Sequence, residues 1–431
     1  MSKKSPSPLS SPSSSASASA SSPSSSRRRS SIVDLLSAPP APTDRRLSSV
    51  SNGDDDHAIV FSDWYDIQLS DLVQKEKVVY VQEDSSVQQA FEVMDSHGFT
   101  SIPIAASGNS SSSSVRTFDY ADLTTYLLLV LGQIEPVQSS SEIADMIDKA
   151  RRGLSVPVGS FVSLLGAKDP FVSVAPDATL GTAAEILGSG VHRIAVTSGD
   201  NDLEGIVSQR RFVRYIWENG RLFKSLQDLF QTPLSDLHIG SKNVVSVNGD
   251  ELVITALERM HSEGVSSLAV VDNNNDLLGN ISIVDTRLLT KSSHSAYLKY
   301  TCKQFLTVIL SNRGLVDGKD TYPVFHVTKD SSLGRTIAKL VATNAHRLWI
   351  VGSTSGSGSS STTGTNNPAM SPTIPSGSPS SVGGHLEGVI SLTDIIHLFA
   401  RRAGKDSLDP GAARQQRRRS SSSSVRPTRI L

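Results

Sequence analysis

Residues 244–270 read "VVSVNGDELVITALERMHSEGVSSLAV": a Val-rich run, a longer stretch with helical spacing, and a second apolar run. Four apolar residues in its middle recur at the spacing of one helix face: Leu252, Ala256, Leu257 and Met260. The Val-rich runs on either side favour strands. The phrase "GNISIVDTR" (Gly279–Arg287) follows, with a third apolar run and a Ser that can cap a helix. The stretch therefore predicts a β-α-β-β-α unit.

The same pattern occurs three more times along the chain. The upstream halves are "VVYVQEDSSVQQAFEVMDSHGFTSIPI" (Val78–Ile104), "FVSVAPDATLGTAAEILGSGVHRIAV" (Phe171–Val196) and "VFHVTKDSSLGRTIAKLVATNAHRLWIV" (Val324–Val351). Their downstream phrases are "VRTFDYADL" (Val115–Leu123), "GIVSQRRFV" (Gly205–Val213) and "GVISLTDII" (Gly388–Ile396). Four copies of one unit predict an α+β protein that is built from four repeats.

The repeated pattern resembles the cystathionine-β-synthase repeat, the CBS domain, from Asp66 to Ala400. The resemblance implies two CBS-pair (Bateman) modules, in which repeat 1 pairs with repeat 2 and repeat 3 with repeat 4 through their sheets. The predicted units are a disordered Ser/Pro-rich tail at 1–57, repeats at 58–135, 155–222, 230–292 and 320–402, and a disordered basic tail at 403–431. A flexible Ser/Gly-rich insertion at 352–384 lies inside repeat 4, where a hairpin tolerates a long loop. A disc within one chain and a disc between the chains of a homodimer both stay open.

The charge of the chain is divided between its tails and its centre. The net charge is -1, but residues 1–50 carry seven Lys/Arg against two Asp, and residues 401–431 carry nine against two. The central region is therefore near -13, which argues against nucleic-acid binding through the folded core. The lone Cys302 excludes an internal disulfide and the usual cysteine zinc sites. The longest apolar run, Tyr126–Gly132, is too short to cross a membrane, and we expect a soluble intracellular protein.

The helix starts of the repeats carry candidate ligand-binding residues. In nucleotide-binding CBS proteins, the third strand ends in Ser/Thr-x-x-Asp, where the hydroxyl faces phosphate or sugar and the Asp accepts from ribose. Repeats 3 and 4 match this motif at Ser282–Asp285 and Ser391–Asp394. Repeat 2 keeps Ser208 but has Arg211 in place of the Asp, and repeat 1 has Asp119–Asp122. A helix start at these positions would also turn its N-terminal amides toward phosphate.

Two His-Arg pairs are the second candidate feature. They are His192–Arg193 in repeat 2 and His346–Arg347 in repeat 4, each at the start of the second strand. Similar pairs reach nucleotide phosphates in the γ subunit of AMP-activated protein kinase, and the arginine fork suits phosphate. Repeats 1 and 3 depart from the pattern, with Thr100–Ser101 and Ser266–Ser267.

The most complete predicted site for AMP, ADP or ATP lies in the second module. Its residues are Ser282, Asp285, His346, Arg347, Ser391 and Asp394. An incomplete counterpart consists of His192, Arg193 and Ser208. The structural alternative is that the Ser and Asp residues only cap helices, that the arginines pair with carboxylates, and that no cofactor is required.

The tails contain basic-directed serines that suit protein kinases. The patterns "RRRSS", "RRLSS" and "RRRSS" contain Ser30, Ser48 and Ser420. A phosphate at any of them would replace local positive charge with negative charge. We therefore expect phosphoregulation through the tails.

The chain also resembles the fungal SDS/MOC family of four-CBS-repeat proteins. Ser70–Ile104 and "FDYADLTTYLLLVLG" (Phe118–Gly132) carry this resemblance. It implies a non-catalytic regulator in cytoplasm and nucleus that inhibits or modulates a type-2A-like phosphatase in cell-cycle progression, DNA replication, cell separation and nutrient response. Its expected partners are phosphatase or kinase subunits. An adenine-nucleotide energy sensor similar to the kinase γ subunit is the alternative. An enzyme is not expected, because no barrel-sized segment remains outside the repeats.

Overall fold

The computed structural model describes residues 39–40, 63–73, 78–105, 116–136, 141–165, 172–198, 203–290, 292–317, 326–352, 384–405 and 425–427. The predicted insertion lies outside these residues except at its ends, 352 and 384. The predicted tails lie mostly outside them, and so do the candidate phosphorylation sites Ser30, Ser48 and Ser420.

Each repeat folds around a three-stranded sheet with the predicted element order. Repeat 1 contains β1 (Val81–Gln82), α4 (Val87–Ser96), β2 (Ser101–Ala105), β3 (Arg116–Asp119) and α5 (Tyr120–Val130). Repeat 2 contains β5 (Val172–Val174), α8 (Leu180–Gly188), β6 (Arg193–Thr197), β7 (Leu203–Ser208) and α9 (Gln209–Asn219). Repeat 3 contains β8 (Ser246–Asn248), α12 (Val253–Ser262), β9 (Ser267–Val271), β10 (Leu277–Ser282) and the 3-10 helix η4 (Ile283–Leu288). Repeat 4 contains β11 (His326–Val327), α14 (Leu333–Thr343), β12 (Arg347–Val351), β13 (Leu386–Ser391) and α15 (Leu392–Arg402).

The sheets share one topology, which confirms the α+β prediction. In each, the second strand of the repeat is central, parallel to the first and antiparallel to the third. The third strands of repeats 3 and 4 alternate buried with half-buried residues because one face covers the core. Connecting elements are η2 (Trp64–Asp66), α3 (Leu69–Leu72), β4 (Ile134–Pro136), α6 (Ser141–Arg151), α7 (Val158–Leu164), η3 (Gly220–Leu222), α10 (Lys224–Gln231), α11 (Leu234–Leu237), η5 (Ser292–Lys299), α13 (Cys302–Asp317) and β14 (Val425–Pro427).

The two repeats of one module, called sister repeats below, exchange the segments that precede them, and repeat 1, predicted at 58–135, is an example. The segment 63–73 packs on repeat 2: Leu69 N donates to Ala178 O (2.8 Å) and Leu180 N donates to Ile67 O (2.7 Å). Its apolar side chains join the core that contains α8 of repeat 2 and are removed from water there.

The segments at the start of the other repeats, predicted at 155–222, 230–292 and 320–402, also bond to the sister repeat. Their backbone hydrogen bonds include Val158 N to Ser85 O, Leu234 N to Ser331 O and Cys302 N to Glu251 O. Sister repeats are therefore connected by backbone as well as by side chains, and neither can leave its partner without losing these bonds.

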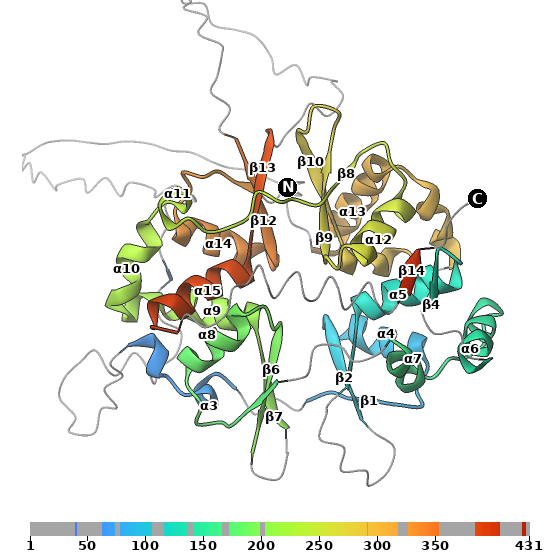
Figure 1. The fold of residues 1–431 in the computed structure, drawn as a ribbon, viewed down its shortest axis with the longest axis horizontal. Helices are drawn as coiled ribbons and strands as arrows, with labels where there is room; N and C mark the ends of the chain where they lie inside the picture. Colours follow the sequence, from blue (N-terminus) through green and yellow to red (C-terminus); the bar gives the residue numbers. More distant parts are fainter. Residues whose placement is uncertain are drawn as a thin grey trace, which may run out of the picture.

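The predicted modules are confirmed, and their sheets face each other in pairs (Figure 1). Between repeats 3 and 4 lies an apolar cluster of Ala269, Val271, Leu277, Trp349, Val351 and Leu386. Trp349 Nε1 donates to Asn280 Oδ1 across this interface at 3.2 Å.

The two modules meet through helices and form one disc within a single chain. Repeats 2 and 4 share one large apolar core, and repeats 1 and 3 share another. Helices α8 and α15 approach so closely that a Cβ on Gly188 would lie 3.0 Å from His397 Cα. Gln209 Nε2 donates to Thr393 Oγ1 (3.0 Å) in the same contact. The four repeats thus surround a common centre (Figure 1).

Three aromatic rings connect separate parts of the repeat 2–repeat 4 core. Trp64 comes from the exchanged segment, Phe212 from α9 and Phe399 from α15. Their ring centroids lie 5.6 Å apart for Trp64–Phe399, 6.1 Å for Trp64–Phe212 and 6.4 Å for Phe212–Phe399. All three are buried, so the core depends on residues that are far apart in sequence.

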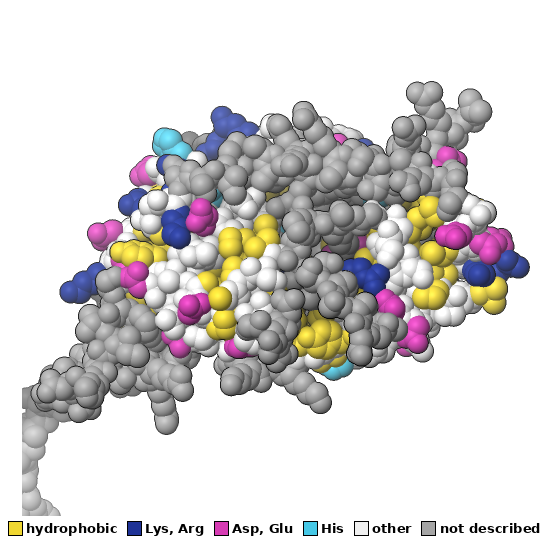
Figure 2. All heavy atoms as spheres, turned by 60° about the horizontal axis from the view of Figure 1, so that its bottom comes forward, with side chains coloured by type: hydrophobic (Ala, Val, Ile, Leu, Met, Phe, Trp, Pro, Cys, Tyr) yellow, Lys and Arg dark blue, Asp and Glu magenta, His cyan; other side chains and the backbone are white. Residues whose placement is uncertain are grey.

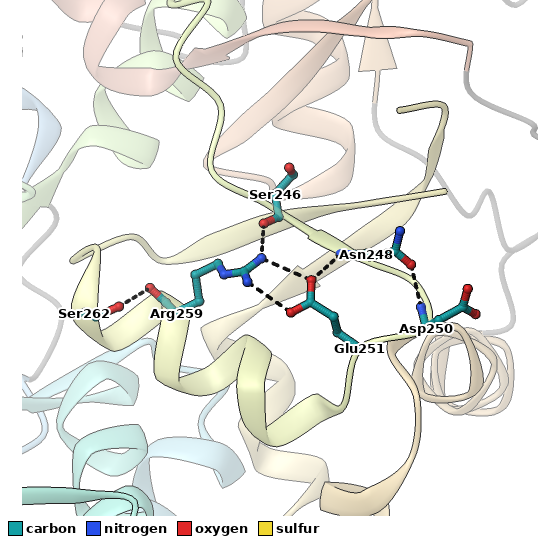
Figure 3. A network of polar contacts seen from close by, with 6 residues as sticks. All are labelled: Ser246, Asn248, Asp250, Glu251, Arg259 and Ser262. Atoms are coloured by element: carbon teal, nitrogen blue, oxygen red, sulfur yellow. Dashed lines mark hydrogen bonds and ion pairs between the residues drawn. The ribbon is translucent and has the colours of Figure 1, made fainter. Parts of the chain in front are cut away.

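A polar network fixes the first helix of repeat 3 to its first strand (Figure 3). Arg259 donates to both carboxylate oxygens of Glu251, at 3.3 and 3.0 Å, and to Ser246 O at 2.7 Å. The Glu251 carboxylate also accepts from Asn248 N at 2.9 Å. Such a bidentate ion pair has well-defined geometry, and it positions α12 against β8.

Within the C-terminal segment that was predicted to be a disordered tail, Val425–Pro427 form strand β14. The strand pairs antiparallel with β4. Three residues of this segment therefore have a defined place beside repeat 1. In the part of the chain that the structure describes, no helix is long and apolar enough to cross a membrane.

Candidate functional site

The Ser-x-x-Asp motif of repeat 4 caps its helix. Ser391 Oγ donates to Asp394 Oδ2 (2.6 Å), and the same carboxylate oxygen accepts from Ser391 N (2.8 Å). Asp394 N in turn donates to Ser391 Oγ at 3.4 Å. This reciprocal arrangement is a capping box, which satisfies backbone amides that the first helical turn leaves without partners.

The equivalent residues of the other repeats have the same role. Asp285 Oδ2 accepts from Ser282 N at 2.8 Å, and Asp119–Asp122 form a capping box of their own. In repeat 2 Ser208 accepts from Arg211 N, but the reciprocal bond is absent because an arginine cannot accept it. The helix-start residues therefore cap a helix in each repeat.

Each arginine of the two His-Arg pairs reaches across to the sister repeat. Arg347 Nη2 donates to Ser266 Oγ (2.7 Å) and Nη1 to Ser267 O (3.4 Å). Arg193 Nη2 donates to Thr100 Oγ1 (2.9 Å) in the first module. Thr100 and Ser266, which depart from the His-Arg pattern, therefore accept hydrogen bonds from Arg193 and Arg347 of the other repeat in their module.

Sheet register brings the two predicted features together. Arg347 lies opposite Ser391, and Arg193 lies opposite Ser208. The His-Arg pair and the helix-start serine of one repeat are consequently neighbours at the same end of its sheet. This end faces the centre of the disc, where repeats 2 and 4 meet.

The basic residues of repeats 2 and 4 converge on one another. His346 as a whole residue is exposed. Protein atoms nevertheless surround its imidazole, and burial is the largest cause of a pKa lowered to about 3. The other causes are four nearby basic side chains: Arg210, His192, Arg347 and Arg193. His346 is therefore neutral at physiological pH, because both its burial and the neighbouring arginines disfavour the protonated ring.

The arginines of this cluster are also perturbed. Burial lowers the pKa of Arg193, while Asp119 and Asp122 raise it. The pKa of Arg210 is lowered by burial and then by Arg214 and Arg193. We call the set His192, Arg193, Arg210, His346 and Arg347 the central basic cluster. Such a concentration of cationic donors suits a phosphate group.

Arg210 is the member of this cluster that the sequence motifs did not identify. Its signal is the Arg-Arg dipeptide at 210–211 directly after Ser208. Arg211 has a structural role, since its Nη2 donates to Leu72 O at 2.8 Å. Arg214, one turn further along α9, donates to Asn344 Oδ1 of repeat 4 at 3.0 Å.

Asp285 belongs to a different neighbourhood from the central basic cluster. Together with Asp95, and after burial, it raises the pKa of Tyr120 in repeat 1 to about 12. Thr124 and Thr286 share a hydrogen bond of 3.1 Å in the same contact. Of the six predicted residues, His346 and Arg347 therefore lie near basic residues of repeat 2, and Asp285 lies near repeat 1.

The described residues contain no group of three or more His, Cys, Asp or Glu side chains that could hold a metal ion. Cys302 is buried within the repeat 1–repeat 3 core. Burial, and then Glu251, raise the pKa of its thiol to about 12. A thiol with such a pKa is a poor nucleophile at neutral pH.

The chain matches the CBS domain family at residues 69–110, 162–218 and 234–287. Protein SDS23 of Yarrowia lipolytica is 49% identical over 92% of this chain and 81% of its own length. The sds23 protein of Aspergillus niger is 37% identical over 92% and 82%. Among solved structures, protein MJ1225 of Methanocaldococcus jannaschii, described as an archaeal homologue of γ-AMPK, gives a TM-score of 0.53 at 13% identity, covering 77% of this chain and all of that one.

These matches and the four-repeat fold define a protein that is built from CBS domains. At the level of sequence, the resemblance to SDS23 proteins extends over nearly the whole length of the chain. The chain belongs to the SDS23 family.

Proposed function

We propose that the chain is a non-catalytic regulator that restrains a type-2A-like protein phosphatase. The proposed setting is that of the fungal family it resembles: cell-cycle progression, DNA replication, cell separation and nutrient response, in cytoplasm and nucleus. The proposal rests on the observation that residues of the predicted site hold the fold together. Asp285 and Asp394 cap helices, while Arg193 and Arg347 connect sister repeats. This use favours a rigid platform that presents its surface to a partner.

The surface of the described residues supports a protein partner. On the face drawn in Figure 2, acidic and basic side chains are interspersed, without a broad area of Lys and Arg. A nucleic-acid surface would concentrate positive charge instead. We therefore propose phosphatase or kinase subunits as partners of the folded core.

Affinity purification of the tagged full-length chain from a fungal cell tests this proposal. Co-purification of a type-2A phosphatase subunit, and lower phosphatase activity when the purified chain is added, are the expected results. The variant Phe399→Ala loosens the platform and should weaken both effects. Phosphatase activity that stays unchanged with an excess of the chain would contradict the proposal. Fluorescence microscopy of the tagged chain would test its distribution between cytoplasm and nucleus.

A second candidate function is adenine-nucleotide sensing, and the central basic cluster favours it. Burial is the largest cause of the lowered pKa of His346, and repulsion from basic side chains of repeats 2 and 4 lowers it further. A nucleotide phosphate would relieve this repulsion and would connect the two modules through their arginines. AMP, ADP or ATP binding would then shift how the repeats pack.

Calorimetry of the full-length chain with AMP, ADP and ATP tests the second function. Arg210→Met should weaken binding by about tenfold to a hundredfold, because a hydrogen bond to a charged group is worth roughly 1.5–3 kcal/mol. Arg221→Met, on the exposed surface of η3, is the matched control and should leave binding unchanged. Absence of heat at about 1 mM nucleotide would rule out the sensor function at cellular concentrations.

A further inference from the structure

An acidic groove lies on repeat 1, beside helices α6 and α7. It has a volume of about 820 Å³, and its charged lining consists of Glu83, Asp84, Arg116 and Glu142. The guanidinium of Arg116 is bound to Glu83 Oε2 at 2.6 Å and to Ser163 Oγ at 2.8 Å. With three carboxylates and one guanidinium, the lining has a net charge of -2. Such a groove attracts a basic ligand.

Strand β14 brings the basic end of the chain to the same region. Its register sets Val425 opposite Pro136 and Pro427 opposite Ile134, in antiparallel orientation. Residues that precede Val425 therefore leave the pairing at the Pro136 end of β4. The main chain of repeat 1 leaves β4 at that same end and enters α6, whose second residue is Glu142.

The sequence before β14 is complementary in charge to the groove. Residues 411–431 contain six arginines and neither Asp nor Glu. Arg417–Arg419 lie six or more residues before Val425. Six extended residues span at most about 20 Å, which leaves these arginines within reach of the start of α6. An extended segment anchored by strand addition and held by charge is a familiar mode of peptide recognition.

We propose that the acidic groove on repeat 1 is the docking site for the chain's own basic segment Arg417–Arg419, with β14 as its backbone anchor. The groove supplies the carboxylates of Glu83, Asp84 and Glu142, and strand pairing fixes the direction in which the segment runs. Ser420–Ser424 lie between the anchor and the arginines. Phosphate on these serines places negative charge near Glu142 and opposes docking.

Hydrogen-deuterium exchange of the full-length chain tests this docking through the β4 peptide that contains Ile134 and Glu135. Replacing the three arginines together (Arg417→Ser, Arg418→Ser and Arg419→Ser) should speed its exchange by about tenfold, since three partly exposed ion pairs contribute that order. The same replacement at Arg27–Arg29, in the other basic tail, is the matched control and should leave exchange unchanged.

Variants of the groove give a second, independent readout. Glu142→Lys should speed exchange of the β4 peptide as the arginine replacements do, whereas Asp145→Lys should not. Both residues are exposed on α6, but only Glu142 lines the groove. Raising the ionic strength should reduce protection in the native chain. Unchanged exchange in both the arginine variant and Glu142→Lys overturns the proposal. So does a β4 peptide that becomes protected only when a separate Arg-rich peptide is added.

Discussion

Replacing Phe399 by Ala should loosen repeat 2 and the exchanged N-terminal segment, although Phe399 belongs to repeat 4. The side chain is 0% exposed, and its ring contacts Trp64 and Phe212, with centroids 5.6 and 6.4 Å away. Truncation of a buried Phe costs about 3–5 kcal/mol. Each lost aromatic pair accounts for roughly 0.5–1.5 kcal/mol of that cost.

Amide exchange under native conditions measures where this cost appears. The amides of Leu69 and Leu180 form the hydrogen bonds that hold the exchanged segment on repeat 2. A loss of about 3 kcal/mol should speed their exchange by roughly a hundredfold, since 1.4 kcal/mol corresponds to tenfold. Phe305→Ala, in the core of repeats 1 and 3, is the matched control and should act mainly on the amide of Cys302.

The shared core would be refuted if Phe399→Ala sped exchange within repeat 4 and left the Leu180 amide unchanged. In that case the two repeats would open separately, and the contact between α8 and α15 would contribute little to stability. Exchange that rises at Leu180 as much in Phe305→Ala as in Phe399→Ala would show that both cores open only together.

Three further predictions concern polar groups. The folded pKa of His346 lies below its unfolded value of 6.5, so its stabilising contribution is complete above pH 6.5 and falls as the pH drops toward 3. In urea titrations, His346→Asn should therefore lose less stability between pH 7.5 and 5.5 than the native chain does. Arg347→Lys removes the fork that bonds Ser266 and should lower the free energy of unfolding by about 1–2 kcal/mol, whereas unchanged unfolding would mean that the bond contributes nothing. Glu251→Gln breaks the bidentate pair with Arg259 and should lower the free energy of unfolding by about 1–2 kcal/mol. Scanning calorimetry should then show a thermal midpoint that is several degrees lower.

The sequence was sufficient for the repeats, because each carries its own periodicity. Residues 244–270 alternate between strand and helix patterns, and the structure places β8, α12 and all but the last residue of β9 within them. Their pairing into modules also followed from the family resemblance. Local pattern could not show the exchange of 63–73 onto repeat 2, because the apolar residues of α3 would fit either sister equally well by periodicity alone.

The sequence was enough to predict which residues lie at the candidate site, but it was less informative about what each residue does there. Spacing places Ser391 and Asp394 at a helix start, and this spacing serves a cap as well as it serves a ligand. Thr100 and Ser266 seemed to be departures, but they accept hydrogen bonds from Arg193 and Arg347. Such pairings link residues about eighty to ninety positions apart, and no single repeat contains the information that specifies them.

Titration of the His346 imidazole by nuclear magnetic resonance tests most directly whether repeats 2 and 4 meet at the central basic cluster. The expected pKa lies far below 6.5, near 3, and should rise toward 6.5 in Arg210→Met and when AMP is added. A pKa near 6.5 in the native chain, unaffected by Arg210→Met, would show that the basic residues of the two repeats do not converge.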